Sequence, residues 1–201
     1  MASTNGAAPD RAPDALEPVT AWRAWFVGRE SDGEPPRLHS VIHNCEWPVG
    51  QELEASCLTT RGIVSRPHPA PADGCQCGIY GTARVDGLAN YVGHGLGPVP
   101  RIQAIGLVRL WGVVREHEHG WRASRGYPCR LWLPTHDFRD ERIENWDELA
   151  MALADYGVPV EMLERGRSHE ALASLRAWEA SLGTTLNGGA RAVGRPGRQL
   201  R

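Results

Sequence analysis

Lysine is absent from this sequence of 201 residues, so all 22 of its basic residues are arginine. The formal net charge is -2 with the histidines neutral. Such a balance provides no overall electrostatic attraction to nucleic acid or to an anionic membrane. Alanine, glycine and proline are abundant, as is typical of proteins from GC-rich genomes. We therefore attribute the excess of arginine to codon usage rather than to phosphate recognition.

Long apolar runs are also lacking. No stretch approaches the ~20 apolar residues that a membrane-spanning helix needs. The N-terminus has neither the basic start nor the apolar core of a secretory signal. We therefore expect a cytoplasmic protein that does not contact a membrane. Because thiols stay reduced in the cytosol, the five cysteines are interpreted as metal ligands, core residues or reactive groups rather than as disulfides.

Composition divides the chain into four segments. Residues 1–18 are rich in alanine, proline and aspartate and are predicted to form a disordered leader. Residues 184–201 form a tail rich in arginine and glycine that is also predicted to be disordered. This tail is either merely solvated or makes weak contact with nucleic acid. Between these ends we expect a β-rich domain at 19–134 and a helical part at 135–183 that packs on it.

Short alternating runs predict the strands of the β-rich domain. The first three runs are separated by turn residues and lie at 21–30, 37–42 and 52–57. The strongest signal lies between Ile102 and Leu133, where two β-branched runs flank a polar turn and predict a hairpin. Two glycines inside the first of these runs indicate a bulge or a tight bend, as in a small curled sheet.

Two helices are predicted near the C-terminus. Helical spacing runs from Asn145, a candidate N-cap, to Tyr156, and again from Ser168 to Leu182. The apolar faces consist of Trp146, Leu149, Leu153 and Tyr156 in the first helix and of Leu172, Leu175, Trp178 and Leu182 in the second. Strands first and helices last predict an α+β fold. We expect a small curled or barrel-like antiparallel β-sheet with a Cys/His metal loop, followed by C-terminal helices.

Three cysteines and one histidine have a spacing that suits a metal ion. Cys57, His68, Cys75 and Cys77 give the pattern Cys-x10-His-x6-Cys-x-Cys. Zinc prefers four such ligands in a tetrahedron, and loops of this length close easily around one ion. Prolines stiffen the segment that presents the histidine, and glycines flank the cysteine pair, where the backbone has to turn. We predict a zinc site, and residues 68–78 are called the Cys/His loop below.

Three other interpretations of these residues stay open. Cys45, with His43 nearby, could replace Cys57 as the fourth ligand. An iron–sulfur cluster is chemically compatible with Cys and His, although the paired Cys-x-His boxes of a Rieske centre are missing. The residues could also be unrelated core cysteines and a loop histidine. A core position is what we expect for Cys129, which lies in an apolar strand.

The Cys/His loop ends in a triplet that also occurs in a family of nucleases. Gly78-Ile79-Tyr80 and Tyr91-Val92-Gly93 resemble the signature of the GIY-YIG nucleases, in which two tyrosines, an Arg and a Glu-bound metal act on phosphate. Arg101 is the nearest candidate for that Arg. The segment that follows has prolines and strand character where the family has a helix. Residues 84–92 are instead predicted to form one helical turn in which Tyr91 packs, which argues against a nuclease.

Polar and aromatic residues also gather on the predicted hairpin. The two histidines on either side of Glu118 are expected at an exposed tip, with a second metal pair or an acid–base pair as the alternative. Arginine with aromatic residues on a sheet can bind single-stranded nucleic acid by charge and stacking. Trp111, Trp121 and Arg122 are therefore candidate binding residues.

Two motifs of the chain together resemble a known group of proteins. The loop motif HPxPxxGCxCGIY at 68–80 and the hairpin motif LWGxVxEHExGWRA at 110–123 are similar to those of an uncharacterised actinobacterial protein family. The likeness covers about residues 20 to 160 and brings no activity with it. It implies that the Cys/His loop and the hairpin form one unit, to which the Gly-Ile-Tyr triplet belongs.

These residues predict a cytoplasmic, non-catalytic, zinc-stabilised binding module whose partner is a protein or a nucleic acid. The first alternative is a metal-dependent enzyme such as a GIY-YIG-like nuclease, and the second is an iron–sulfur or redox sensor. A zinc ion closed by four protein ligands would favour the binding module. Three protein ligands and a position open to water would favour an enzyme.

Overall fold

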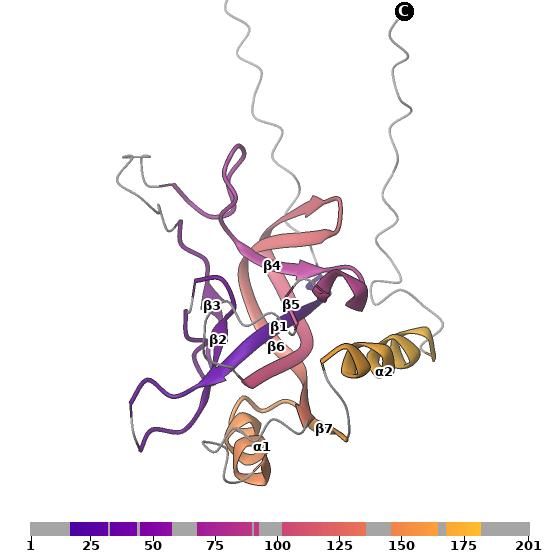
Figure 1. Cartoon of the computed structure of the whole chain (residues 1–201). Coiled ribbons are helices and arrows are strands. Elements are labelled where there is room, and N and C mark those ends of the chain that lie inside the picture. Colours follow the sequence, from indigo (N-terminus) through magenta and orange to yellow (C-terminus); the bar gives the residue numbers. More distant parts are fainter. Residues whose placement is uncertain are drawn as a thin grey trace, which may run out of the picture.

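The computed structural model describes most of the predicted folded body of the chain. The described residues are 17–31, 33–43, 45–57, 68–89, 91–92, 102–135, 146–164 and 168–181. The predicted tail at 184–201 and nearly all of the predicted leader at 1–18 lie outside them. Within the described ranges the fold is α+β, as predicted: one curled sheet is accompanied by two α-helices from the C-terminal part of the chain (Figure 1).

The elements follow one another in a mainly β-then-α order. The strands are β1 (Val19–Gly28), β2 (Arg37–Ser40), β3 (Leu53–Glu54), β4 (Ile79–Thr82), β5 (Ile102–His117), β6 (Gly120–Thr135) and β7 (Val160–Glu164). The helices are the 3-10 helix η1 (Val85–Leu88) and the α-helices α1 (Trp146–Ala154) and α2 (Ser168–Ser181). The predictions of β1, β2, the long β5–β6 hairpin and both α-helices are confirmed. Of the strand predicted at 52–57 only Leu53–Glu54 is formed, and β4 and β7 were not predicted.

Four strands of the sheet form a ring. β1 pairs with β5 along one edge, β5 pairs with β6, and β6 pairs with β4. β4 completes the circuit on the other edge of β1 through the single register pair Trp22↔Thr82. Because only one register pair makes this closure, the sheet is strongly curled but is not a continuous barrel. β1, β5, β6 and β4 are called the four-strand ring below.

The long hairpin contains the bulge that its glycines indicated. The register of β5 against β6 shifts between Trp111 and Val114, and Gly112 has a φ of 73° there. A side chain at this position would also collide with Ser124 across the hairpin, so both backbone and space require glycine. Beyond the bulge β5 no longer pairs with β1, and β6 pairs with β4, the strand that follows the Cys/His loop.

β7 departs from the antiparallel pattern of the other strands. It pairs in parallel with the end of β6, with Val160 opposite Leu131 and Glu164 opposite Thr135. The helical part predicted at 135–183 therefore contains a strand between its two helices. This strand extends the sheet on the side of α1 (Figure 1).

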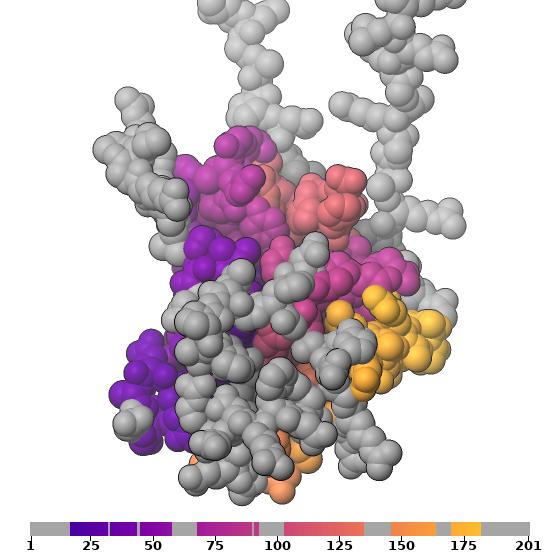
Figure 2. Space-filling view, viewed as in Figure 1, coloured from indigo at the N-terminus to yellow at the C-terminus, as the bar shows by residue number. Residues whose placement is uncertain are grey.

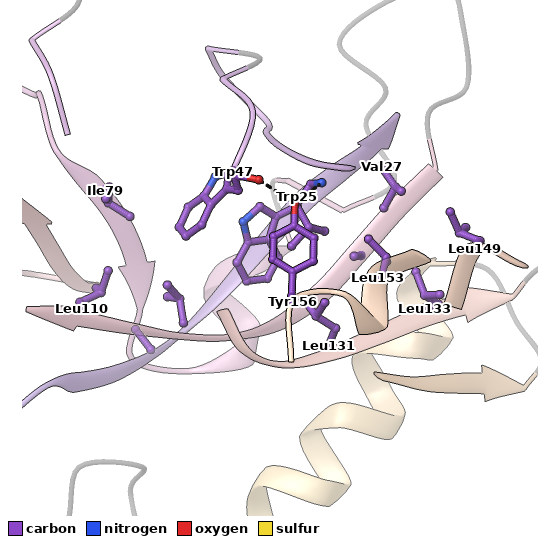
Figure 3. Packing of buried hydrophobic residues seen from close by; sticks show 14 of the residues in the cluster. Trp25, Val27, Trp47, Ile79, Leu110, Leu131, Leu133, Leu149, Leu153 and Tyr156 are labelled. Atoms are coloured by element: carbon purple, nitrogen blue, oxygen red, sulfur yellow. Dashed lines mark hydrogen bonds between the residues drawn. The ribbon is translucent and has the colours of Figure 1, made fainter. Parts of the chain in front are cut away.

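Alternation along β1 directs apolar side chains to both faces of the sheet. Trp25 and Val27 point to the inside of the curl, where Leu149 and Leu153 of α1 and Trp47 complete a buried cluster (Figure 3). The rings of Trp25 and Trp47 meet edge to face, with their centroids 5.5 Å apart. Removing a large apolar side chain from water contributes about 1.5–3 kcal/mol. This inner cluster therefore stabilises the curl and fixes α1 against it.

The outer face of the sheet has an apolar cluster of its own. Trp22 of β1 stacks on Trp132 of β6 at 5.5 Å between ring centroids and meets Trp178 of α2 edge-on at 5.7 Å. Val85 and Leu88 of η1 belong to the same cluster. In the space-filling view the yellow surface of α2 adjoins the magenta surface that contains η1 (Figure 2). The predicted helical turn after β4 is thus confirmed, and it covers one face of the four-strand ring.

Two buried polar side chains tie the helices to the sheet. Tyr156 follows α1, and its hydroxyl accepts a hydrogen bond from the N–H of Leu38 at 3.0 Å and donates one to the carbonyl oxygen of Trp47 at 2.7 Å. Glu179 of α2 accepts a hydrogen bond from Nε1 of Trp22 at 2.8 Å. Each helix is therefore held by a specific polar contact as well as by its apolar face.

Candidate metal centre

The four predicted ligand side chains come together at one end of the four-strand ring. Cys57 lies just after β3, and the other three belong to the Cys/His loop that leads into β4. The ligand atoms of Cys57, His68, Cys75 and Cys77 all lie within 4.8 Å of one another, and all four residues are half-buried. Among the described residues this is the one group of three or more Cys, His, Asp or Glu side chains placed in this way.

The distances between the ligand atoms fit a single tetrahedral ion. The Sγ atoms of Cys57 and Cys75, two of the ligand atoms, are 3.7 Å apart, and the imidazole ring of His68 lies beside Sγ of Cys77. Zn–S bonds of ≈ 2.3 Å at tetrahedral angles require a sulfur–sulfur distance of about 3.8 Å. The sulfur atoms of Cys57 and Cys75 therefore have the separation that one zinc ion needs, and a Cys3His group placed in this way can bind a metal.

The structure brings Cys57, and not Cys45, to the other three ligands. Cys45 is exposed, and its thiol donates to the carbonyl oxygen of Glu46 at 3.5 Å. Cys129 is half-buried on β6 at the margin of the outer apolar cluster, and burial raises the pKa of its thiol. Of the five cysteines, three therefore share one site and two stand apart from it.

The thiols of the site differ in their affinity for protons. The pKa of Cys75 is lowered to about 7, first by a hydrogen bond from the backbone N–H of Cys77 and then by the side chain of Cys77. Partial burial, followed by the hydrogen bond and the charge of Cys75, raises the pKa of Cys57 to about 11. A metal ion would have to displace the proton of Cys57, so its binding is coupled to proton release.

The imidazole of His68 is oriented by the backbone of its own loop. Its Nδ1 lies 3.0 Å from the carbonyl oxygen of Pro69. This hydrogen bond and the next contact, with Cys75, raise the pKa of His68. Because a carbonyl oxygen can only accept, Nδ1 is the donor, and Nε2 of the neutral ring is then free to bind a metal. Such a carbonyl contact is the usual outer partner of a metal-binding histidine.

Side chains of the sheet support the loop from below. Arg122 of β6 donates to carbonyl groups of the Cys/His loop, and so does Arg115 of β5. Tyr80 of β4 donates through its hydroxyl to the carbonyl oxygen of Gln76. No pattern in the sequence indicates these three roles, because a backbone carbonyl has the same chemistry at every residue. Figure 2 shows the magenta surface that includes the loop next to the salmon surface of the hairpin tip.

The three predicted binding residues do not form one surface. Trp121 and Arg122 are neighbours on β6, so their side chains point to opposite faces of the strand. Trp121 is half-buried against the inner cluster, and Arg122 is engaged by the Cys/His loop. Trp111, also half-buried, lies opposite Arg125 in the hairpin.

The Gly-Ile-Tyr triplet has a structural task at each position. Gly78 turns the chain out of the loop with a φ of 126°, Ile79 is buried in the inner cluster, and Tyr80 holds the loop. Tyr91 lies in a turn after η1 rather than in a strand paired with β4, and it is 36% exposed, so the expectation that it packs was wrong. Gly93 and Arg101 lie outside the described residues.

The histidines of the hairpin tip are not part of the candidate site. Glu118 and His119 form the exposed turn, as expected. His117 belongs to β5, and its ring lies 5.6 Å from that of Tyr80 between centroids. These residues do not join a group of three metal-binding side chains in the described part of the chain.

No family model, curated protein or solved structure matches the chain. The geometry of the Cys3His group is therefore the basis of the functional conclusion.

Proposed function

We propose that the chain is a non-catalytic binding module in which Cys57, His68, Cys75 and Cys77 hold one structural Zn²⁺. The observation that carries the proposal is the convergence of four protein ligand atoms within 4.8 Å. Structural zinc sites are closed by four protein ligands, whereas catalytic sites keep one position for water or substrate. A site whose four ligands all come from the chain is therefore a structural zinc site.

The chemistry of the donor set supports zinc over other metals. Three thiols and an imidazole are soft or borderline ligands, which suit zinc and exclude the oxygen-loving calcium and magnesium. An iron–sulfur cluster attaches its protein ligands to different iron atoms, so those ligands must spread more widely than around one ion. The close grouping of all four atoms supports a mononuclear site.

The proposed ion joins two parts of the chain that are separate in the sheet. One ligand follows β3, and the other three lie in the loop before β4. Zinc would fasten this loop to the end of the four-strand ring and present it to a macromolecular partner. The net charge of -2 favours a protein over a nucleic acid as that partner. The proposal extends to the actinobacterial family with the two motifs, whose members should share the site.

A cytoplasmic location also belongs to the proposal. Reduced thiols are required for a Cys3His site, and the cytosol maintains them. None of the helices in the described part of the chain is both long and apolar enough to cross a membrane.

Elemental analysis of the purified full-length protein tests the proposal. We expect one zinc per chain in the wild type and a marked loss of zinc in Cys75→Ser and in Cys77→Ser. Cys45→Ser and Cys129→Ser are matched controls and should keep their zinc. The zinc site is refuted if no metal co-purifies and both loop variants melt like the wild type. Bound iron with visible absorption would instead favour an iron–sulfur or redox sensor.

The closed coordination is tested separately with cobalt. Co²⁺ in place of zinc should give the strong visible absorption of a tetrahedral ion with thiolate ligands. Small anions such as azide bind to an open coordination position, so they should leave this spectrum unchanged. A spectrum that shifts with added azide would contradict a structural site and support a catalytic one.

A further inference from the structure

The underside of the Cys/His loop is held by one arginine through several backbone groups. Nη1 of Arg122 donates to the carbonyl oxygens of Cys75 and of Cys77, the second at 3.3 Å, and Nη2 donates to that of Ala72 at 3.2 Å. The planar guanidinium fork thus spans the loop from Ala72 to its second cysteine, Cys77. Few side chains other than arginine could reach three acceptors with a fixed geometry.

Arg122 has a partner of the same charge. Arg115 on β5 lies directly opposite Arg122 in the register of the hairpin. Its Nε donates to the carbonyl oxygen of Pro71 at 3.2 Å, and its Nη1 forms an ion pair with Asp73. Like charges opposite each other on two strands repel, so this pair needs compensation from the groups above it. Carbonyl oxygens, a carboxylate and three thiols that become thiolates provide it.

A third contact links the sheet to the peptide group between Gln76 and Cys77. The hydroxyl of Tyr80 donates to the carbonyl oxygen of Gln76 at 2.7 Å. That carbonyl shares a planar trans peptide with the N–H of Cys77, so the two groups point in opposite directions. By binding the carbonyl, Tyr80 fixes the direction of the N–H of Cys77, which points away from the sheet.

We propose that Arg122, assisted by Arg115 and Tyr80, is a positioning residue that sets the conformation of the Cys/His loop before a metal binds and thereby strengthens metal binding. The proposal deepens the proposed function and rests on it. Because these side chains bind the carbonyl oxygens on the face of the loop that lies against the sheet, the N–H groups and the thiols are left on the opposite face, where the ion would lie. The two guanidinium groups add positive charge beneath a site that carries net negative charge once three thiolates bind one divalent ion.

The test compares zinc dissociation constants in full-length variants by competition with a coloured chelator. Partners that orient metal ligands typically contribute 10–100-fold to affinity, so Arg122→Gln should weaken zinc binding by about that factor. Arg122→Lys should fall between wild type and Arg122→Gln, because an ammonium keeps the charge but not the fork. The control is Arg130→Gln on the same strand, which removes an ion pair with Glu161 of β7, away from the loop, and should leave the constant unchanged.

Two further measurements separate positioning from general stabilisation. Well below the melting temperature of every variant, the Co²⁺ spectrum should be altered in Arg122→Gln and unaltered in Arg130→Gln. The amide of Cys75 donates to the carbonyl oxygen of Ala72 at 3.4 Å. In the metal-free proteins, its hydrogen exchange should be slower in the wild type than in Arg122→Gln. If Arg122→Gln does not fold, Tyr80→Phe carries the same test, because it frees the Gln76 carbonyl without removing a charge.

The outcomes distinguish this inference from the proposed function. A wild type that binds no zinc refutes the proposed function. A wild type that binds zinc, together with unchanged dissociation constants and unchanged loop exchange in the variants, refutes the positioning role alone. A lower melting temperature with the Co²⁺ spectrum, zinc affinity and loop exchange all unchanged also counts against it, because general stabilisation then explains the contacts.

Discussion

Gly78 lies at the point where the Cys/His loop meets the sheet. Its φ of 126° is in a region that side chains disfavour. A Cβ atom there would lie 3.2 Å from Cβ of Pro71 and 3.3 Å from Cβ of Arg122. The loop can therefore lie close to β6 only because this residue has no side chain. The first position of the Gly-Ile-Tyr triplet is explained by this close approach.

We expect Gly78→Ala to lower the free energy of unfolding by about 2 to 5 kcal/mol, since both the backbone and the contacts are strained. Urea denaturation measures this loss. Gly50→Ala is the matched control, because Gly50 also has a positive φ, of 69°, but has open space around it. Gly50→Ala should lower the free energy of unfolding by roughly 1–2 kcal/mol, the cost of the left-handed backbone conformation alone. Equal losses in the two variants would show that the close approach is unimportant.

The sequence predicts the ligand set at this scale much better than it predicts the residues that support it. Zinc accepts few kinds of side chain, and Cys57, His68 and the cysteine pair are close enough in sequence for their spacing to be informative. Arg122 was instead predicted to bind nucleic acid. Its actual partners are backbone carbonyls of a loop more than forty positions earlier, and neither end of such a contact leaves a pattern in the sequence.

At the scale of elements, α2 is attached to the sheet through a buried carboxylate. Glu179 is 9% exposed and accepts hydrogen bonds from Nε1 of Trp22 at 2.8 Å and from the N–H of Val85 at 3.3 Å. It also forms an ion pair with Arg84. One side chain thus joins α2 to both β1 and η1.

Glu179→Leu should destabilise the protein by about 2 to 6 kcal/mol, because it leaves two buried donors without an acceptor at about 1–3 kcal/mol each. Glu179→Gln keeps an acceptor oxygen and should cost less. Thermal denaturation measures the relative stability of the two variants. Ser174→Ala, on the exposed side of α2, is the control. A Leu variant as stable as the Gln variant would contradict this role.

The contact between α1 and β2 depends on the protonated form of Tyr156. Burial is the main cause that raises the pKa of this phenol from 10.0 to about 12. The unfolded chain therefore releases the proton at lower pH than the folded protein does. The stability that Tyr156 contributes is fully present below pH 10 and is lost as the pH rises to about 12.

Tyr156→Phe provides the matching experiment. At neutral pH the variant should be less stable, because the N–H of Leu38 and the carbonyl of Trp47 lose their partner. Between pH 10 and 12 the wild type should lose this advantage, so the two unfolding free energies converge. Denaturation curves across this range measure the difference, and a constant gap would disprove the link to Tyr156 ionisation.

Among the elements, local pattern predicts those that are long or strongly periodic. The β5–β6 hairpin and the two α-helices have such patterns, and their boundaries lie within a few residues of the predicted ones. β7 has only five residues, of which Glu161 and Met162 are exposed. Its pairing with β6 depends on where the packing of α1 places the chain that follows this helix, so no local signal predicts it. The closure of the four-strand ring by β4 is non-local in the same way.

At the scale of the whole molecule, the candidate metal centre and the apolar clusters are separate. Neither cluster contains any of the four ligands. The ion would therefore stabilise one end of the four-strand ring, while burial of tryptophans and leucines stabilises the remainder.

Removal of zinc with a chelator should consequently cause local rather than global change. We expect faster hydrogen exchange in the Cys/His loop and a lower melting temperature. Exchange in β1 and α1 should be nearly unchanged, since the inner cluster remains. Exchange measured peptide by peptide by mass spectrometry checks this distribution. Loss of protection throughout the chain would mean that the fold requires the ion, as in small zinc fingers.

The single register pair that closes the four-strand ring has a consequence for the order of assembly. β1 is synthesised first, but its partners in β5 are 75 to 91 positions further along, from Val27↔Ile102 to Val19↔Leu110. Contacts this distant form slowly, whereas a hairpin such as β5–β6 forms from neighbouring residues.

We therefore expect the β5–β6 hairpin to form first, β1 to pair with it next, and the contact between β1 and β4 to form last. In pulse-labelled refolding, amides of β6 should be protected before those of β1, and the reverse order would refute this sequence of events. Until β5 has been made, the tryptophan-rich first strand lacks its longest partner and can pair, among the described strands, with the short β2 and at one position with β4. A nascent chain halted at that point is therefore the one most exposed to aggregation.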